Sequence, residues 1–450
     1  MEKTKGLGEA RMMGIFGKSG AGKSWMAAYV ITGFAKNKDM GILVLDPQGE
    51  LAKNFQSARE LRLPFHEMLK YACGRELHIV RSDQLKLDPR NLRDVALLTR
   101  KFFEYEELFR TSPDKYRDFL DELYDKILNT RFDDPSPINP VTYYLYAHDA
   151  IVNGEAEKIG KDVTLDTLIP TVWAKFLDEA KKIIDSILTT QEPRNRAKRS
   201  LDEKKKSEIW INKFRSFLNL FDTTQGISTD SIVDLLLNQR SVVIIDLSEV
   251  GNRVPWINEK ELQALFISMI LQKIRERAEK MYKESNSLAN VLIAMDEAHN
   301  YVGTYSDVSE EVRRLREQLV KNVKETRKYG IGWLFITQTT VDFDKEIYRQ
   351  LHDYFFLYGL GVGADLQHMK EVVPKEFIEV YKSLPNPKQT NNYWAMHVGS
   401  LSVLNTATSA TFIRLPSPEE FLRLNFNMTL EDLKKKEEED KKRGYVEEVS

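Results

Sequence analysis

The chain has 450 residues, 42% of them hydrophobic, so it can bury a large core and form two or three domain-sized parts. Its 66 basic and 68 acidic residues give a net charge of -2, which excludes a uniformly basic nucleic-acid-binding coat but not a basic strip or the lining of a ring. The single cysteine, Cys73, excludes an intramolecular disulfide framework, and the absence of a signal peptide or of an apolar run that could span a bilayer predicts a cytoplasmic protein.

The first motif lies between a predicted strand, Met12–Phe16, and a helix-like run, Trp25–Phe34. The segment Gly17–Ser24 reads G-K-S-G-A-G-K-S and fits the pattern G-x-x-x-x-G-K-[ST] without a mismatch. Such a loop brings several backbone N–H groups to one anion, and the helix N-terminus adds a partial positive charge. The flanking strand and helix disfavour a chance Gly/Ser-rich turn, so the motif predicts binding of a nucleoside triphosphate.

Two residues of this loop have expected chemical tasks. The Lys23 ammonium reaches the β- and γ-phosphates, and the Ser24 hydroxyl is a ligand of Mg²⁺. We therefore expect Lys23 to be catalytic and Ser24 to bind metal. The predicted nucleotide-binding residues are Gly17, Ser19, Gly20, Ala21, Gly22, Lys23, Ser24 and Trp25.

Further along the chain, the strands Gly41–Leu45 and Leu77–Arg81 are followed by a change of character. The first is a continuous apolar run, as expected for a parallel strand covered on both faces. From about Asn91 to Arg240, helix-period segments separated by Pro- and Asp-rich breaks dominate. Helices are predicted at Val95–Phe109, Lys115–Asn129, Ile169–Thr189 and Glu208–Phe221. We interpret this part as a mostly helical insertion.

A basic run at residues 194–206 lies within the insertion. Two interpretations stay open: its cations contact phosphates, or the run is a flexible solvated loop. It contains little aromatic interleaving, which does not support stacking of single-stranded bases.

After the insertion, alternating strands and helices resume. Strands are predicted at Ser241–Ile245, Val291–Met295, Gly332–Ile336, Tyr354–Leu360, Tyr393–Val398 and Ala410–Leu415. Helices are predicted at Glu259–Lys283 and Ser309–Tyr329. The tail Thr429–Ser450 is rich in Lys and Glu and is either a solvated helix or disordered.

Two of these strands end in aspartate: Asp246, followed by leucine, and Asp296, followed by Glu297. Hydrolysis of a nucleoside triphosphate needs one carboxylate to hold Mg²⁺ and another to polarise the attacking water. Adjacent residues can divide that work because strand side chains alternate in direction. We therefore assign Asp296 to Mg²⁺ and Glu297 to the water. The alternative is an ordinary strand-end turn.

Gln338 ends the strand that follows Asp296 and Glu297. Because strand carboxyl ends converge on the ligand crevice of a parallel sheet, we expect its amide to contact the γ-phosphate or the attacking water. For His299, a structural role and γ-phosphate sensing both stay open.

The charged helix at 309–329 carries many cations, most of which we expect to form a solvated face balanced by glutamates. A ring motor also needs an arginine that one subunit offers to the γ-phosphate bound by its neighbour. Arg327, just before the turn into a strand, is favoured for this role over Arg349 and Arg313.

Together these motifs resemble the HerA/FtsK superfamily of P-loop DNA pumps, and most closely its HerA-like branch. The resemblance spans most of Met12–Pro416, although Asn91–Arg240 contributes almost no motif. The motifs that carry it are Gly17–Ser24, Asp46-Pro47-Gln48-Gly49-Glu50, Val243-Ile244-Ile245-Asp246-Leu247-Ser248, Met295-Asp296-Glu297-Ala298-His299, Arg327-Lys328-Tyr329-Gly330 and Thr337-Gln338.

The resemblance implies an α/β fold: a RecA-like P-loop NTPase core with a mostly parallel sheet, interrupted by a helical insertion. The expected parts are residues 1–90 and 241–428 as the two pieces of the core, 91–240 as the insertion and 429–450 as a charged tail. It further implies a hexameric ring of identical subunits that uses ATP and Mg²⁺ to thread double-stranded DNA, with Arg327 as the arginine finger.

The same resemblance implies a nuclease or other effector as partner, in DNA-end processing or anti-phage defence. Family members usually carry a small β-barrel before the phosphate loop, and we expect this barrel on another polypeptide or lost by truncation. The alternatives to a translocase or helicase are a DNA packaging or conjugation ATPase, and an ATP-dependent switch or scaffold that pumps nothing.

Overall fold

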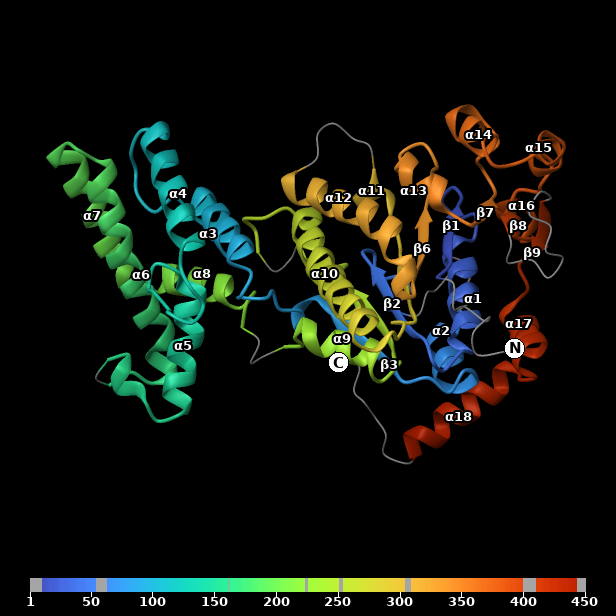
Figure 1. Ribbon diagram of the computed structural model, residues 1–450, viewed down its shortest axis with the longest axis horizontal. Helices are drawn as coiled ribbons and strands as arrows, with labels where there is room; N and C mark the ends of the chain where they lie inside the picture. Colours follow the sequence, from blue (N-terminus) through green and yellow to red (C-terminus); the bar gives the residue numbers. More distant parts are fainter. Residues whose placement is uncertain are drawn as a thin grey trace. The chain divides into compact units, whose positions relative to one another are not determined.

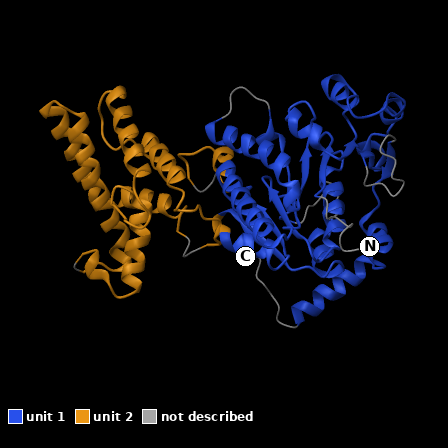
Figure 2. Ribbon diagram, viewed as in Figure 1, with its two compact units in different colours: residues 1–82, 230–249, 263–450 blue, residues 83–229, 250–262 orange. Residues whose placement is uncertain are grey.

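The computed structural model describes residues 10–53, 63–160, 162–222, 226–250, 254–303, 309–399 and 410–442. The chain divides into two compact units (Figure 2). An α/β unit comprises Met1–Ser82, Asp230–Glu249 and Gln263–Ser450, and a helical unit comprises Asp83–Thr229 and Val250–Leu262. The last part of the predicted charged tail, residues 443–450, lies outside the described residues.

A nine-stranded sheet forms the centre of the α/β unit in the described part of the chain (Figure 1). Its order is β3-β4-β2-β5-β6-β1-β7-β8-β9, with parallel pairing from β3 to β7 and antiparallel pairing of β7 with β8 and of β8 with β9. The strands are β1 Met12–Phe16, β2 Gly41–Asp46, β3 Leu77–Arg81, β4 Val242–Asp246, β5 Val291–Met295, β6 Ile331–Thr337, β7 Asp353–Leu357, β8 Trp394–Gly399 and β9 Thr411–Arg414. This confirms the predicted α/β class with a mostly parallel sheet.

Helices cover both faces of this sheet, which explains why the strands β1, β2, β4, β5, β6 and β7 are buried along their whole length. Figure 1 shows α1 on one side of the sheet and α10 and α12 on the other. The helices that lie wholly or mostly in this unit are α1 Lys23–Ala35, α2 Phe65–Glu67, α9 Thr229–Leu237, α10 Glu259–Ser285, α11 His299–Val302, α12 Glu310–Glu325, α13 Lys345–Gln350, α14 Gly363–Met369, α15 Lys375–Lys382, α16 Pro387–Thr390, α17 Pro418–Phe426 and α18 Leu430–Lys442.

The parallel register brings several strand ends to one edge of the sheet. Phe16 at the end of β1 pairs with Thr337 at the end of β6, and Asp46 of β2 pairs with Asp246 of β4. Next to them, Leu45 of β2 pairs with Met295, the last residue of β5. The loops that follow these strands carry most of the motifs found in the sequence, so these motifs leave the sheet at the same edge. The exception is Arg327-Lys328-Tyr329-Gly330, which precedes β6.

The helical unit has an aromatic core of its own. The Phe103 and Phe176 rings stack with centroids 5.1 Å apart, and the Trp173 ring lies 4.9 Å from that of Phe214. Rings of this size bury a large apolar area. The helices are α3 Leu92–Glu106, α4 Pro113–Leu128, α5 Pro140–Val152, α6 Leu165–Ile187, α7 Gln191–Lys205 and α8 Glu208–Leu218.

The basic run at residues 194–206 lies almost entirely in α7, so its interpretation as a flexible loop is wrong. Several of its cations pair with acids of α6: Lys198 lies 2.6 Å from Asp185, and Lys205 lies 2.8 Å from Asp178. Exposed pairs of this kind stabilise little. The helix is held mainly because Ala197 and Leu201, one turn apart, are buried.

Within the described residues, every helix is too short or too polar to span a lipid bilayer.

Replacing Trp173 with alanine is expected to lower the free energy of unfolding of the helical unit by about 3–5 kcal/mol. The ring is fully buried among Phe103, Phe176, Trp210 and Phe214, and alanine leaves a cavity there. Urea denaturation followed by circular dichroism measures the loss. The matched control is Tyr146→Ala, an exposed aromatic residue of the same unit that should change stability by less than about 0.5 kcal/mol. Equal losses in the two variants would contradict this account.

Candidate active site

The phosphate loop is anchored at its start by backbone hydrogen bonds to two neighbouring segments. The Gly17 N–H donates to the Thr337 carbonyl at 3.2 Å, and the Lys18 N–H donates to the Tyr358 carbonyl at 3.2 Å. At its other end the loop turns into α1 through Gly22, whose φ of 95° lies in the left-handed region. A Cβ atom at this glycine would lie 2.7 Å from the Tyr393 ring, so both its conformation and its surroundings require glycine.

Lys23, the first residue of α1, is buried. Burial lowers the pKa of its ammonium, while the carboxylates of Glu297, Asp296 and Glu50 favour the charged form. A lysine surrounded by acidic groups at the start of a helix is well suited to contact phosphate oxygens.

The other predicted nucleotide-binding residues lie in two environments. Ser19 and Gly20 are exposed, and Ser24 is half-buried, so nucleotide can reach them. Trp25 is instead packed inside the protein, with its ring centroid 5.4 Å from that of Tyr393 in an edge-to-face arrangement. The remaining members lie in the anchored part of the loop.

Asp296 and Glu297 follow β5 and are both buried. The Glu297 N–H donates to the Asp296 carboxylate at 2.9 Å. Burial, together with the charges of Asp46 and Glu297, raises the pKa of Asp296 well above its usual value. Its carboxylate therefore benefits from any cation placed beside it, as expected of a metal ligand.

Glu297 has a left-handed backbone, with φ of 44°. This conformation costs a non-glycine residue about 1–3 kcal/mol and is found preferentially at functional sites. The turn it forms directs two successive carboxylates into the same region, where strand geometry would send them to opposite faces.

Two side chains hold the Glu297 carboxylate. The Gln338 amide donates to it at 2.9 Å, and the His299 Nδ1 atom lies 3.1 Å from its other oxygen. Burial alone would raise the pKa of Glu297, but the contacts with His299 and Gln338 and the charge of Lys23 outweigh burial and lower it. Glu297 is thus an ionised carboxylate that can accept a proton.

Glu50 belongs to this site although it was absent from the site residues predicted from the sequence. The Ser24 hydroxyl donates to its carboxylate at 2.6 Å. Its signal in the sequence is the D-P-Q-G-E motif, which pointed to a family but not to a contact. Asp46 forms the turn that presents Glu50, because its buried carboxylate accepts hydrogen bonds from the N–H groups of Gly49 at 2.9 Å and of Leu51 at 2.8 Å.

Asp246 lies beside this turn rather than at the Lys23 site. Its carboxylate accepts hydrogen bonds from the Ser248 hydroxyl at 2.6 Å and from the Ser248 N–H at 2.9 Å. The segment Asp246–Ser248 at the end of β4 therefore forms a local turn next to the turn after β2.

The residues at this edge fit Mg²⁺ bound together with a triphosphate. The described residues contain no group of three or more His, Cys, Asp or Glu side chains that could hold a metal ion by itself. Mg²⁺ in nucleotide sites needs only one or two protein oxygens, because phosphates and waters supply the rest. The Ser24 hydroxyl and the buried Asp296 carboxylate are oxygen donors of this kind.

Arg327 is the predicted residue that the fold keeps away from these groups. It is exposed, in a 3₁₀ turn Arg327–Tyr329 that precedes β6, whereas Gln338 follows the same strand. The seven residues of β6 span about 23 Å. Of the alternatives, Arg313 and Arg349 are also exposed.

A glycine-rich loop between β1 and α1, with the buried carboxylates of Asp296 and Glu297 at the same edge of the sheet, is the arrangement of a P-loop NTPase. The chain belongs to the family "Helicase HerA, central domain", whose model matches residues 10–274, more than half of the chain. It is therefore an ATP-binding P-loop ATPase of the motor type found in the HerA/FtsK superfamily.

Similar solved structures include VirB4 of Thermoanaerobacter pseudethanolicus, at 15% identity over 89% of this chain and 88% of that chain, with a TM-score of 0.45. Another is the genome packaging NTPase B204 from Sulfolobus turreted icosahedral virus 2 in complex with ATP-gammaS. It is 14% identical over 40% of this chain and 69% of that chain, with a TM-score of 0.26. Among curated proteins, none matches the chain in sequence.

Replacing Glu297 with glutamine is expected to lower the ATPase rate at least about 100-fold while ATP still binds, because the variant loses the proton acceptor. Lys23→Ala is expected to lose both binding and turnover. Phosphate release and titration with a fluorescent ATP analogue measure the two properties. The matched control is Glu317→Gln, an exposed glutamate on α12. Hydrolysis by Glu297→Gln at the unmodified rate would show that another group, with Glu50 the first to test, activates the water.

The buried Asp46 should make stability fall as the pH rises. Burial and the charge of Asp246 raise its pKa to about 6 despite the backbone hydrogen bonds that it accepts. Between pH 3.8, which is the ordinary pKa of the group, and about pH 6, the folded state thus binds more protons than the unfolded state. The free energy of unfolding therefore falls by about 2–3 kcal/mol as the pH rises through that window. Urea denaturation at several pH values should show that the free energy of unfolding falls less with pH in Asp46→Asn. It should fall as in the unmodified protein in Asp39→Asn, which changes an exposed residue. Parallel curves for all three proteins would contradict this assignment.

Proposed function

We propose that this protein is an ATP-driven translocase, or helicase, of double-stranded DNA that works as a hexameric ring. In this proposal, each ATP site is completed by Arg327 of the neighbouring subunit. The observation that carries it is that two residues with proposed roles in hydrolysis lie at opposite ends of β6. Gln338 contacts Glu297 at one end, and the exposed Arg327 lies at the other.

The arginine has to come from another subunit for a physical reason. Phosphoryl transfer spreads negative charge over the γ-phosphate oxygens, and an arginine that neutralises it accelerates hydrolysis about 10³–10⁵-fold. In the described part of the chain, the contacts of Lys23, Ser24 and Glu297 include no arginine. The length of β6 keeps Arg327 out of reach of its own site.

The proposed work of the remaining residues follows from their contacts. Bound Mg²⁺ would neutralise charge on the triphosphate. Ser24 and Asp296 supply protein oxygens to hold it, and Lys23 binds the β- and γ-phosphates. Glu297, held ionised, takes the proton of the attacking water, and Gln338 keeps its carboxylate in place.

The DNA cargo is supported by the family, whose description is that of a helicase. We further propose a nuclease or other effector as partner, action in the cytoplasm, and a role in DNA-end processing or anti-phage defence. The division into a core of residues 1–90 and 241–428, an insertion of 91–240 and a tail of 429–450 is part of the same proposal.

Arg327→Ala is expected to lose at least about 100-fold in DNA-stimulated ATPase activity and to keep its affinity for ATP. Mixing it with Lys23→Ala should restore part of the activity, because some interfaces then combine an intact Lys23 with an intact neighbouring Arg327. Steady-state phosphate release with long duplex DNA at low salt, where phosphate contacts are strongest, measures the effect.

The matched control is Arg423→Ala, an exposed arginine on α17, while Arg313→Ala tests the alternative finger. Full activity in Arg327→Ala, or no recovery on mixing, would overturn the proposed finger. ATPase activity that is not stimulated by duplex DNA, together with particle images that lack a six-fold ring, would instead support an ATP-dependent switch.

A further inference from the structure

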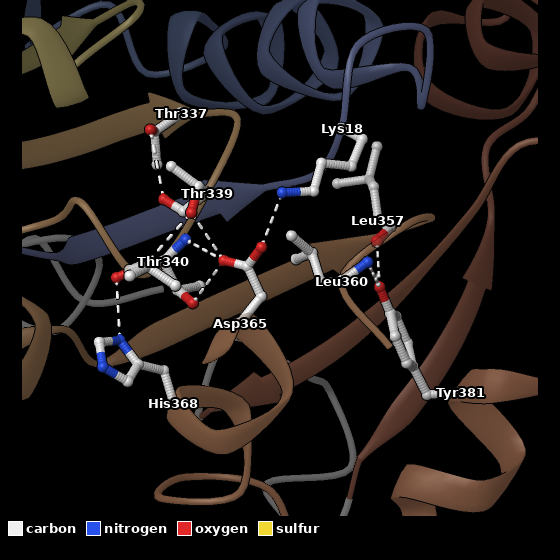
Figure 3. Close-up of polar contacts among 10 residues, drawn as sticks. Lys18, Thr337, Thr339, Thr340, Leu357, Leu360, Asp365, His368 and Tyr381 are labelled. Atoms are coloured by element: carbon white, nitrogen blue, oxygen red, sulfur yellow. Dashed lines mark hydrogen bonds and ion pairs between the residues drawn. The ribbon is translucent and has the colours of Figure 1, made fainter. Parts of the chain in front are cut away.

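The Asp365 carboxylate joins three separate segments at the edge of the active site (Figure 3). It lies in the first turn of α14 and is buried. Its oxygens accept hydrogen bonds from the Lys18 ammonium at 2.7 Å, the Thr339 hydroxyl at 2.7 Å, the Thr340 N–H at 2.8 Å and the Thr340 hydroxyl at 3.0 Å. We call this set the Asp365 junction.

The junction is built around an ionised carboxylate. Burial would raise the pKa of Asp365, but the hydrogen bonds from Lys18, Thr339 and Thr340 outweigh burial and lower it. Hydrogen bonds to a charged acceptor are shorter and stronger than neutral ones, and those at Asp365 have the short distances expected.

One end of the junction is the phosphate loop, of which Lys18 is the second residue. The backbone of Lys18 is locked on both sides: its N–H donates to the Tyr358 carbonyl, and its carbonyl accepts from the Ala21 N–H at 3.0 Å. Its side chain passes over Gly359, where a Cβ atom would lie 2.7 Å from the Lys18 Cγ atom and where φ is 104°. The path of the side chain toward Asp365 is therefore defined by contacts.

The other end is the segment that carries Gln338. Thr339 and Thr340 follow Gln338 directly, and Gln338 donates to Glu297 at 2.9 Å. An unbroken series of contacts thus runs from the Glu297 carboxylate through Gln338 and its neighbours to Asp365, and from there to the phosphate loop.

Helix α15 supports this arrangement from a second direction. The Tyr381 hydroxyl accepts a hydrogen bond from the Leu360 N–H at 3.1 Å and donates to the Leu357 carbonyl. These contacts hold the turn after β7 (Figure 3), and the Tyr358 carbonyl of this turn accepts the hydrogen bond from the Lys18 N–H. The segment from α14 to α15 therefore contacts both the start of the phosphate loop and the end of β6.

We propose that Asp365 is a positioning residue of the ATPase. It holds the Gln338–Glu297 pair at a fixed place relative to the phosphate loop, and so controls the rate of hydrolysis rather than the affinity for ATP. The inference rests on the roles given to Glu297 and Gln338 in the proposed function. The separation of rate from affinity follows because the contacts of Asp365 include Lys18 and the residues after Gln338 but not Lys23 or Ser24.

The test compares Asp365→Asn with the unmodified full chain. Asparagine keeps the shape and an oxygen that can accept from Thr339 and Thr340, but removes the charge that holds Lys18. We expect kcat to fall about tenfold and the Kd for an ATP analogue to change less than about twofold, because a small displacement of a catalytic group is costly for the rate. Lys18→Met should reproduce the loss, and Lys18→Arg should recover most of the rate.

The double variant Lys18→Met/Asp365→Asn should be no slower than either single variant, since both changes break the same contact. The matched control is Glu371→Gln, an exposed acid just after α14. If Asp365→Asn does not fold, Lys18→Met, at a half-exposed side chain, still tests the contact.

Gln338→Ala is measured alongside to separate this inference from the assignment on which it depends. A slow Gln338→Ala with a fully active Asp365→Asn would overturn the positioning role and leave the site assignment standing. Full activity in both variants would overturn both. A parallel loss of kcat and ATP affinity in Asp365→Asn, or additive losses in the double variant, would also overturn the positioning role.

Discussion

One electrostatic constraint organises the α/β unit: several carboxylates and one ammonium are buried together at the carboxyl edge of a parallel sheet. Burial raises the pKa of both Asp296 and Asp46, the charge of Asp46 adds to the shift at Asp296, and Lys23 is the cation beside Asp296. Such a cluster is unfavourable unless phosphate and a metal ion complete its charge balance. The backbone is shaped to maintain it, with glycines in the phosphate loop and a left-handed Glu297 after β5. The structure is thus arranged around a ligand that carries both negative charge and a cation.

Much of this edge can be predicted from the sequence, because parallel strands bring motifs far apart in the chain to one place. The strands Met12–Phe16 and Val291–Met295 have the predicted bounds, and the contact between Gln338 and Glu297 follows from the rule that strand carboxyl ends converge. Pairings through loops cannot be predicted in this way. The bonds Ser24–Glu50 and Lys18–Asp365 join side chains whose directions depend on turns, and no periodic pattern encodes those directions.

Two helices of the helical unit that the sequence did not reveal, α5 and α7, lack a recognisable amphipathic pattern for opposite reasons. In α7 only Ala197 and Leu201 are buried, and the rest of the helix is charged, so its apolar pattern is too sparse to recognise. In α5 the opposite holds: most residues are apolar, and the consecutive residues Thr142, Tyr143 and Tyr144 are all buried, so burial is not confined to a single stripe. Both helices are stabilised by packing within the helical unit, which a reading of local periodicity does not capture.

The strand β6 gives the proposed ring a direct means of communication between sites. Gln338 at its carboxyl end contacts Glu297, and Arg327 precedes its amino end. If Arg327 serves the neighbouring subunit as proposed, one buried strand of seven residues connects the group that senses its own nucleotide to the group that completes the next site. A buried strand, hydrogen-bonded on both sides to β5 and β1, moves as a rigid element. A change in the position of Gln338 on hydrolysis would then be transmitted along β6 to the turn Arg327–Tyr329 at its amino end. Coupling between subunits would follow from the geometry of the sheet itself.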